Sequence, residues 1–183
     1  MSSAPGHWLS KEAHIRLIRV TIIPGSNDAL VATTSLIARG FQSPTILTNA
    51  GDGSNRLFVA EQTGKIFIIK NGMKLLTPFL DLSSKMVKIS ALYDERGLIG
   101  LVFHPDYETN GRFFVYYSAP KTGTGIDHEA TIAEYHVSAS PDIADASSEK
   151  IIFRVDEPEM NHNGGQEEHS CWNWRYRACS CRN

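Results

Sequence analysis

Apolar residues occur along most of this chain in short runs that turn residues separate. Six of these runs form three consecutive pairs: 57–60 with 66–69, 98–103 with 113–117, and 131–137 with 151–155. The runs are rich in β-branched and aromatic residues, and Gly, Asn, Asp or Pro stands between the two members of each pair. This arrangement is typical of antiparallel hairpins. The pattern therefore predicts three β-hairpins, with a loop at 138–148 inside the third.

Two further apolar runs, at 36–38 and 45–47, bring the expected total to about nine or ten short strands. No long helical period competes with them. Turn signals recur at roughly the 8–12-residue spacing of sandwiches, barrels and propellers. The sequence thus predicts an all-β antiparallel architecture, and periodicity alone does not separate these three forms.

Composition limits the class of protein. With 183 residues, 42% hydrophobic and 21% charged, the chain can form one soluble domain with a real core. A net charge of -2 and a pI near 6.4 predict no nucleic-acid partner and no anionic membrane surface. Charged residues interrupt the first 25 positions, so we expect no signal peptide and no membrane insertion in this chain.

Three strings in sequence carry a family resemblance: "GFQSPTILTNAGDGSNRLFVAEQTGKIFII", "DERGLIGLVFHPDYETNGRFFVYYS" and "IAEYHVSASPDIADASSEKIIFRVDEPEMNHNGGQ". In order, spacing and turn residues they resemble the quinoprotein glucose/sorbosone dehydrogenase family, which includes hedgehog-interacting-protein-like ectodomains. The resemblance implies a six-bladed β-propeller, of which residues 30–166 would form about two blades and a part. It also implies pyrroloquinoline quinone (PQQ) at the mouth of the central channel in the enzymatic members. Residues 1–29 carry no confident resemblance.

Residues 167–183 break with this pattern, because they hold all three cysteines and two of the three tryptophans. After "HNGGQ" the family continues with an apolar strand and a Gly-Asp-Gly turn, which are missing here. We interpret the tail as aberrant, from a frame error or a wrongly joined segment, and the chain as an N-terminal fragment. The alternative is a metal site from His169, Cys171, Cys179 and Cys181, although their spacing matches no common paired-knuckle pattern.

His162 is the candidate catalytic residue. Its imidazole can accept a proton near neutral pH, and the glycines beside it allow close approach to a ligand. The resemblance implies that it is the general base that removes the proton from the anomeric hydroxyl of a sugar while the C1 hydride passes to the quinone. The alternative is a turn histidine whose ring binds backbone carbonyls.

Glu95 falls where the soluble glucose dehydrogenases carry a glutamine that contacts the quinone, so the resemblance implies a cofactor-binding position. A glutamine amide can donate to a quinone oxygen, whereas an ionised glutamate only accepts and repels a tricarboxylate unless it is paired. Arg96 is a possible partner for it. The alternative is a surface turn formed by Asp94, Glu95 and Arg96.

Two other polar residues are expected to be structural. Pro105 favours extended geometry at His104, which suits a strand end. Asp52 lies in a glycine-rich stretch that lacks the EF-hand spacing and is typical of a hairpin turn. Calcium is possible in the intact family domain, with no ligands expected from this chain.

The leading functional prediction concerns the intact parent protein: a PQQ-dependent oxidoreductase that acts on the CH–OH group of an aldose- or sorbosone-type sugar. The basic residues that bind the carboxylates of PQQ would come from later blades. A non-catalytic, hedgehog-interacting-protein-like propeller that binds a protein partner is the alternative, and an inactive truncated product is a third. The resemblance also implies a secreted or periplasmic parent.

Overall fold

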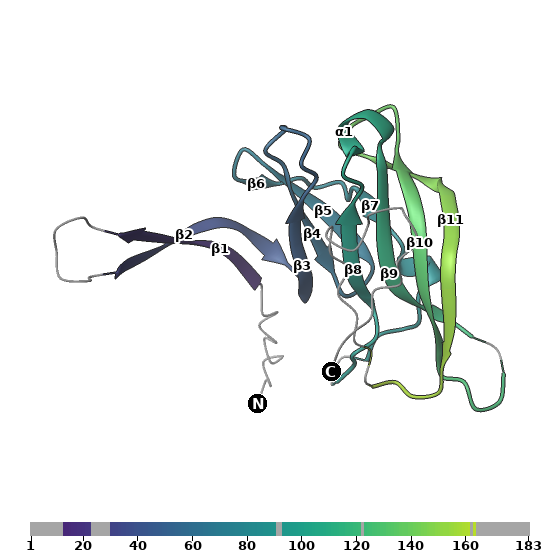
Figure 1. Cartoon of the computed structure of the whole chain (residues 1–183). Helices are drawn as coiled ribbons and strands as arrows, with labels where there is room; N and C mark the ends of the chain where they lie inside the picture. The colour runs from purple at the N-terminus through teal and green to yellow at the C-terminus, as the bar shows by residue number, and fades with distance from the viewer. Residues whose placement is uncertain (1–12, 23–29, 91–92, 122, 162, 164–183) are drawn as a thin grey trace, which may run out of the picture.

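The computed structural model describes residues 13–22, 30–90, 93–121, 123–161 and 163, and these residues form three antiparallel sheets (Figure 1). One sheet pairs β1 (Ala13–Ile22) with β2 (Leu30–Phe41). A second contains β3 (Pro44–Asn49), β4 (Leu57–Glu61), β5 (Lys65–Lys70) and β6 (Met73–Lys74), and β7 (Leu80–Asp81) also pairs with β5. A third has the order β11 (Ala144–Glu157), β10 (His128–Val137), β9 (Arg112–Pro120), β8 (Leu98–Phe103). A 3-10 turn, η1 (Ser83–Lys85), and a short helix, α1 (Tyr107–Asn110), lie in the connections.

All three predicted hairpins are present, as β4–β5, β8–β9 and β10–β11, so the all-β antiparallel prediction is confirmed. One boundary differs. The third hairpin's second strand begins at Ala144, inside the predicted 138–148 loop. Its polar first half pairs with β10 through backbone groups, in the register His136↔Asp145 and Val137↔Ala144. Because ladder hydrogen bonds use the backbone, a polar outer strand can pair without an apolar pattern.

The second and third sheets meet at their edge strands β3 and β8, which lie side by side at the centre of the molecule (Figure 1). The Thr45 hydroxyl of β3 donates a hydrogen bond of 2.8 Å to the Leu98 carbonyl of β8. Each sheet then continues outward, to β6 in one case and to β11 in the other. The third sheet has four antiparallel strands, which is the size of one β-propeller blade, whereas β7 adds a fifth strand to the second sheet.

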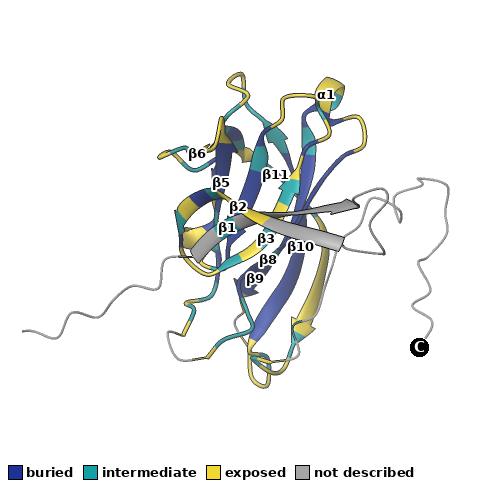
Figure 2. Ribbon diagram, turned by 90° about the vertical axis from the view of Figure 1, so that its left-hand side faces the viewer, coloured by how far each residue is buried: buried dark blue, intermediate teal, exposed yellow. Residues whose placement is uncertain are grey.

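The main core fills the space between these two sheets, where buried residues gather in Figure 2. Alternation along β9 directs Phe113, Val115 and Tyr117 to this side. The Phe58 and Phe103 rings, one from each sheet, lie with centroids 4.5 Å apart, and both are essentially inaccessible to solvent. Apolar burial therefore joins the two sheets into one unit.

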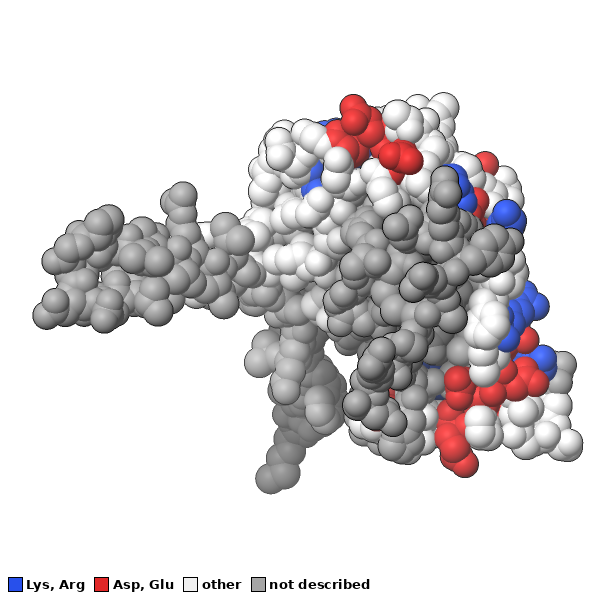
Figure 3. Space-filling view, viewed as in Figure 1, with Lys and Arg blue, Asp and Glu red and all other residues white. Residues whose placement is uncertain are grey.

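A smaller core cluster lies on the other face of the second sheet and consists of Ala38, Phe41, Val59, Phe67 and Ile69. On the face shown in Figure 3, charged side chains of both signs lie mainly along the upper and right-hand margins. Within the described ranges, no helix has the length and apolar character needed to cross a bilayer. The predicted domain limits at residues 29 and 166 adjoin segments outside the described residues and stay predictions.

Candidate functional site

An open hollow of about 670 Å³ lies where β3 and β8 begin. Its described lining comes from four separate parts of the sequence: Ser43, Pro44, Thr45, Gln62, Glu95, Ile99 and Asn163. The fold thus brings Glu95 to the same hollow as Asn163, the residue next to His162. His162 itself lies outside the described residues, so its role as general base stays a prediction.

The side chain of Gln62 fixes the backbone on both sides of Glu95. Its Nε2 atom donates to the Asp94 carbonyl at 2.7 Å and to the Arg96 carbonyl at 2.8 Å. The Gln62 carbonyl accepts from the Leu98 amide at 3.0 Å. Gln62, which lies in the turn after β4, therefore fixes the backbone of the loop that leads into β8.

Asp94 and Arg96 hold the same loop from the other direction. The Arg96 guanidinium donates to Asp94 at 2.9 and 2.8 Å and to Asp127 at 2.9 Å. The Ser90 amide donates to Asp94 as well. The hydrogen bonds from Arg96, helped by backbone donors, outweigh the effect of burial and lower the pKa of Asp94 to about 2. The ion pair between Asp94 and Arg96 is therefore present at neutral pH and stabilises this loop.

Glu95 is half-buried between these anchors, and the Tyr93 hydroxyl donates a hydrogen bond to its carboxylate. That bond raises the pKa of Tyr93, so the phenol stays neutral and serves as a donor to Glu95. The sequence suggested Arg96 as a partner for Glu95. The structure instead directs the Arg96 guanidinium to Asp94 and Asp127.

Gly97 completes the loop and permits its close approach to Gln62. Its φ is +138°, and a Cβ atom there would lie 2.5 Å from the Gln62 carbonyl oxygen. The Gly97 amide donates to the Ser118 hydroxyl, and the Gly97 carbonyl accepts from the Ser118 amide at 3.0 Å. Sequence reasoning missed Gln62 and Ser118. The glycine directly before an apolar strand was a usable signal for the close approach.

The residues expected to be structural have contacts that suit that role. His104 Nδ1, at the end of β8, accepts from the Asp106 amide at 3.0 Å and lies 2.9 Å from Asn110 Nδ2. Asp52 accepts from the Ser54 amide and hydroxyl in the turn between β3 and β4. Its other oxygen lies 2.6 Å from Arg56. Within the described ranges, no cluster of three or more His, Cys, Asp or Glu is placed to hold a metal ion.

The described lining does not by itself fit PQQ. A cofactor with several carboxylates calls for Arg or Lys side chains directed at it. The hollow instead has Glu95, and none of its described lining residues is Lys or Arg. The amide of Gln62 and the hydroxyl of Thr45 already donate to backbone carbonyls. The described lining of the hollow therefore supplies no cationic group for such a cofactor.

The fold and the hollow together define an all-β protein with a polar site at the start of two adjacent edge strands. The chain belongs to the glucose/sorbosone dehydrogenase family, whose family model matches residues 41–168. Among curated proteins it is similar to the Hedgehog-interacting proteins of Mus musculus and Homo sapiens, each 33% identical over 135 residues. Each match covers 71% of this chain and 19% of the relative, so the chain spans about a fifth of these relatives. A plant relative, the HIPL2 protein of Arabidopsis thaliana, is 26% identical over 157 residues, or 63% of this chain and 22% of its own length.

Two solved structures share the fold. The PQQ-bound form of an aldose sugar dehydrogenase from Streptomyces coelicolor matches with a TM-score of 0.54 at 19% identity, over 83% of this chain and 38% of that one. A glucose dehydrogenase from Thermus thermophilus matches with a TM-score of 0.51 at 20% identity, over 69% of this chain and 33% of that one. The chain therefore has the fold of roughly a third of each.

Proposed function

We propose that the intact protein that contains this chain oxidises the CH–OH group of a sugar, with the hollow at Glu95 as part of the active site. One observation carries the proposal: Asn163, adjacent to His162, lines the same hollow as Glu95, although 67 positions separate the two residues in the sequence. The family resemblance implies functional roles for Glu95 and for His162, the neighbour of Asn163. Family membership supports the same reading.

In this proposal the chain supplies orientation and proton removal. The imidazole of His162 accepts the hydroxyl proton of the sugar, since its ordinary pKa lies near the working pH. Glu95 and the amide of Asn163 offer hydrogen-bonding groups to the sugar hydroxyls around it. The oxidant is a cofactor, for which PQQ is the candidate from the family. Its basic contacts belong to the rest of the propeller, of which this chain is about two blades and a part.

The test uses the intact protein and two readouts. Isothermal titration measures whether PQQ binds, and dye reduction measures whether an aldose is oxidised in its presence. We expect His162→Gln to lower kcat by roughly 10²–10⁴-fold, the usual contribution of a general base, with PQQ binding kept. His136→Gln is the matched control, because His136 lies on β10 with a half-exposed side chain. Equal losses in both variants would contradict the role of His162.

A second candidate is a non-catalytic domain that binds a protein partner. The 33% identity to Hedgehog-interacting proteins favours it, as does an acidic hollow without a basic residue in its described lining. Under this candidate the intact protein binds a hedgehog-type ligand in surface plasmon resonance, and neither binds PQQ nor reduces dye. Quinone-dependent sugar oxidation without such binding would exclude it.

We further propose that the intact protein acts outside the cytoplasm, as a secreted or periplasmic protein, in line with the family resemblance. Cell fractionation checks this directly. Recovery of the intact protein only from the cytosol would contradict it.

A further inference from the structure

We infer that Ser43 is a further sugar-binding residue of this hollow, held in an unfavourable backbone conformation that presents its hydroxyl to the ligand. The inference rests on the proposed function and adds to it a residue for which the sequence carried no signal. Ser43 lies in the connection between β2 and β3 and is one of the residues that line the hollow.

The backbone of Ser43 has a conformation that serine rarely adopts. Its φ is +45°, in the left-handed region where glycine and asparagine are the usual residues. Pro44 follows it, and the residue before a proline is normally restricted to extended backbone. In the described part of the chain, the other residues with a positive φ are glycines and two asparagines, Asn55 and Asn71. Among these positions, the conformation is therefore least expected at Ser43.

Hydrogen bonds to the turn after β4 hold Ser43 in this conformation. The Gln62 amide donates to the Ser43 carbonyl at 2.9 Å, and the amide of Gln42 donates to the Glu61 carboxylate at 2.9 Å. The side chain of the same Gln62 donates to the backbone on both sides of Glu95. Gln62 therefore fixes the backbone at two residues of one hollow. Residues that are held in such unfavourable conformations cluster at binding and active sites, which supports a role in binding for Ser43.

The hydroxyl of Ser43 is open to a ligand. Ser43 is exposed, and its hydroxyl has no hydrogen bond to any residue in the ranges that the structure describes. By contrast, the hydroxyl of Thr45 and the side-chain amide of Gln62, in the same lining, already donate to backbone carbonyls. A hydroxyl both donates and accepts hydrogen bonds, as the hydroxyls of a sugar do. Ser43 therefore offers the hollow a polar group that matches a sugar.

Two substitutions separate this role from a structural one. Ser43→Ala removes the hydroxyl and keeps the Cβ atom, so the melting temperature of the intact protein should stay within about 2 °C of the wild type. Ser43→Gly removes the hydroxyl and also relieves the backbone, so it should raise the melting temperature by about 2 °C or more. Both variants should bind sugar roughly 2–10-fold more weakly, which is the usual effect of one lost hydrogen bond.

Sugar affinity is measured by titration calorimetry of the intact protein with D-glucose, D-galactose and D-xylose, and stability by thermal unfolding. Ser84→Ala, at an exposed serine of η1, controls for the loss of a hydroxyl. Asn55→Gly, at a positive φ outside the hollow's lining, controls for the backbone change. Both controls should keep the wild-type affinity. Weaker binding together with a higher melting temperature in Ser43→Gly separates binding from folding, because a folding defect lowers both.

The inference is overturned if either Ser43 variant keeps the wild-type affinity, if a control loses as much affinity, or if Ser43→Gly lowers the melting temperature. Binding of none of the three sugars overturns it as well. The proposed function fails separately: a wild-type protein that binds one of these sugars and does not oxidise it in the presence of PQQ refutes the oxidation. Weaker binding in both Ser43 variants then still supports the role of Ser43. Where the sugar is oxidised, KM should rise in both variants with kcat within about twofold, since Ser43 binds the sugar outside the reacting atoms.

Discussion

Replacing Gly97 with alanine should disrupt the loop that presents Glu95, and the structure separates two reasons for this. The backbone φ of +138° is one that residues with a Cβ atom rarely adopt. In addition, the new Cβ would lie 2.5 Å from the Gln62 carbonyl oxygen and 2.6 Å from its Cγ. Since the closer of these atoms is backbone, the loop or the turn after β4 must move.

Each reason has an expected cost. An unfavourable backbone conformation costs about 1–3 kcal/mol, and an overpacked contact costs about another 1–3 kcal/mol. The loss expected for Gly97→Ala is therefore about 2–6 kcal/mol, out of the roughly 5–15 kcal/mol by which domains are usually stable. The displacement should also release the hydrogen bond from the Leu98 amide to Gln62.

Three other glycines provide controls that separate the two costs. Gly53 has a φ of +69° with no atom within 4 Å of an added Cβ, so its replacement by alanine tests the backbone cost alone. Gly100 has no positive φ, but its Cβ would lie 2.6 Å from Tyr116 Cβ, which tests the steric cost alone. Gly123 has neither feature and is exposed, so we expect a change within about 0.5 kcal/mol.

Urea unfolding followed by circular dichroism, with m-values compared between variants, measures these free energies of unfolding. We expect the order of loss to be Gly97, then Gly100 and Gly53, then Gly123. If Gly97→Ala costs no more than Gly53→Ala, the close approach to Gln62 does not constrain this loop, and the reasoning is refuted.

Three further outcomes are expected. Because the pKa of Asp94 is lowered to about 2 in the folded state, its contribution to stability is complete above about pH 4 and is lost as the pH falls toward 2. In urea titrations from pH 5 to 2, the free energy of unfolding of Asp94→Asn should therefore fall less steeply with pH than that of the wild type. Phe103→Ala should cost about 3–5 kcal/mol by thermal unfolding, whereas Phe153→Ala, at a side chain that is 57% exposed, should cost well under half of that. Glu149→Gln should lower the melting temperature, since it weakens three contacts of one carboxylate, and an unchanged melting temperature would contradict this.

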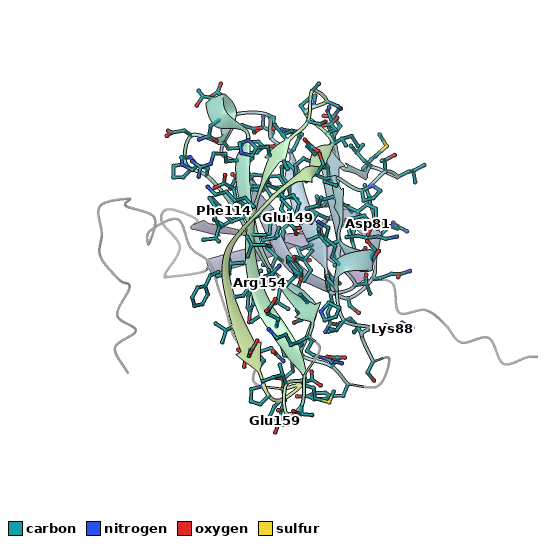
Figure 4. All side chains as sticks on the ribbon, turned by 90° about the vertical axis from the view of Figure 1, so that its right-hand side faces the viewer. Asp81, Lys88, Phe114, Glu149, Arg154 and Glu159 are labelled. Atoms are coloured by element: carbon teal, nitrogen blue, oxygen red, sulfur yellow. The ribbon has the colours of Figure 1, made fainter. Side chains whose placement is uncertain are left out.

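The last of these changes concerns a network on the face of the third sheet that contacts the core. Glu149 of β11, labelled in Figure 4, accepts from the hydroxyls of Tyr117 and Tyr135 and pairs with Lys85 of η1 at 2.7 Å. Burial, together with this carboxylate, raises the pKa of both tyrosines, so they remain donors at any ordinary pH. The Glu149 carboxylate thus links β9, β10, β11 and the η1 turn.

Much of the fold could be predicted from the sequence because strand signals are local. Alternation and turn residues identify β4 and β5 and the pair β8 and β9, since each hairpin is formed by neighbours in the chain. The start of β11 was misplaced because its first residues are polar and pair through their backbone. β1 was missed, because His14, Arg16 and Arg19 interrupt its apolar pattern.

The site was predictable only in part. Glu95 was identified from the motif "DERG", and the importance of its neighbours was not, because their partners are distant in sequence. Gln62 lies more than 30 positions before the two carbonyls that it binds, and Asp127 lies 31 positions after Arg96. A single sequence has no local signal for such contacts, which appear only after the sheets are packed.

The conformation of the site therefore depends on the packing of the second sheet against the third. Leu98, the first residue of β8, has its amide bound to the Gln62 carbonyl and its carbonyl bound to the Thr45 hydroxyl. Both partners belong to the second sheet or to its turns, and Leu98 belongs to the third. Because these bonds and the Gln62 brace span the junction, the loop that carries Glu95 can take this conformation only when β3 and β8 lie side by side. A substitution that loosens the aromatic core between the sheets, such as Phe103→Ala, should consequently weaken sugar binding in the hollow, measured by titration calorimetry, as well as stability, even though the Phe103 side chain is not part of the hollow's described lining.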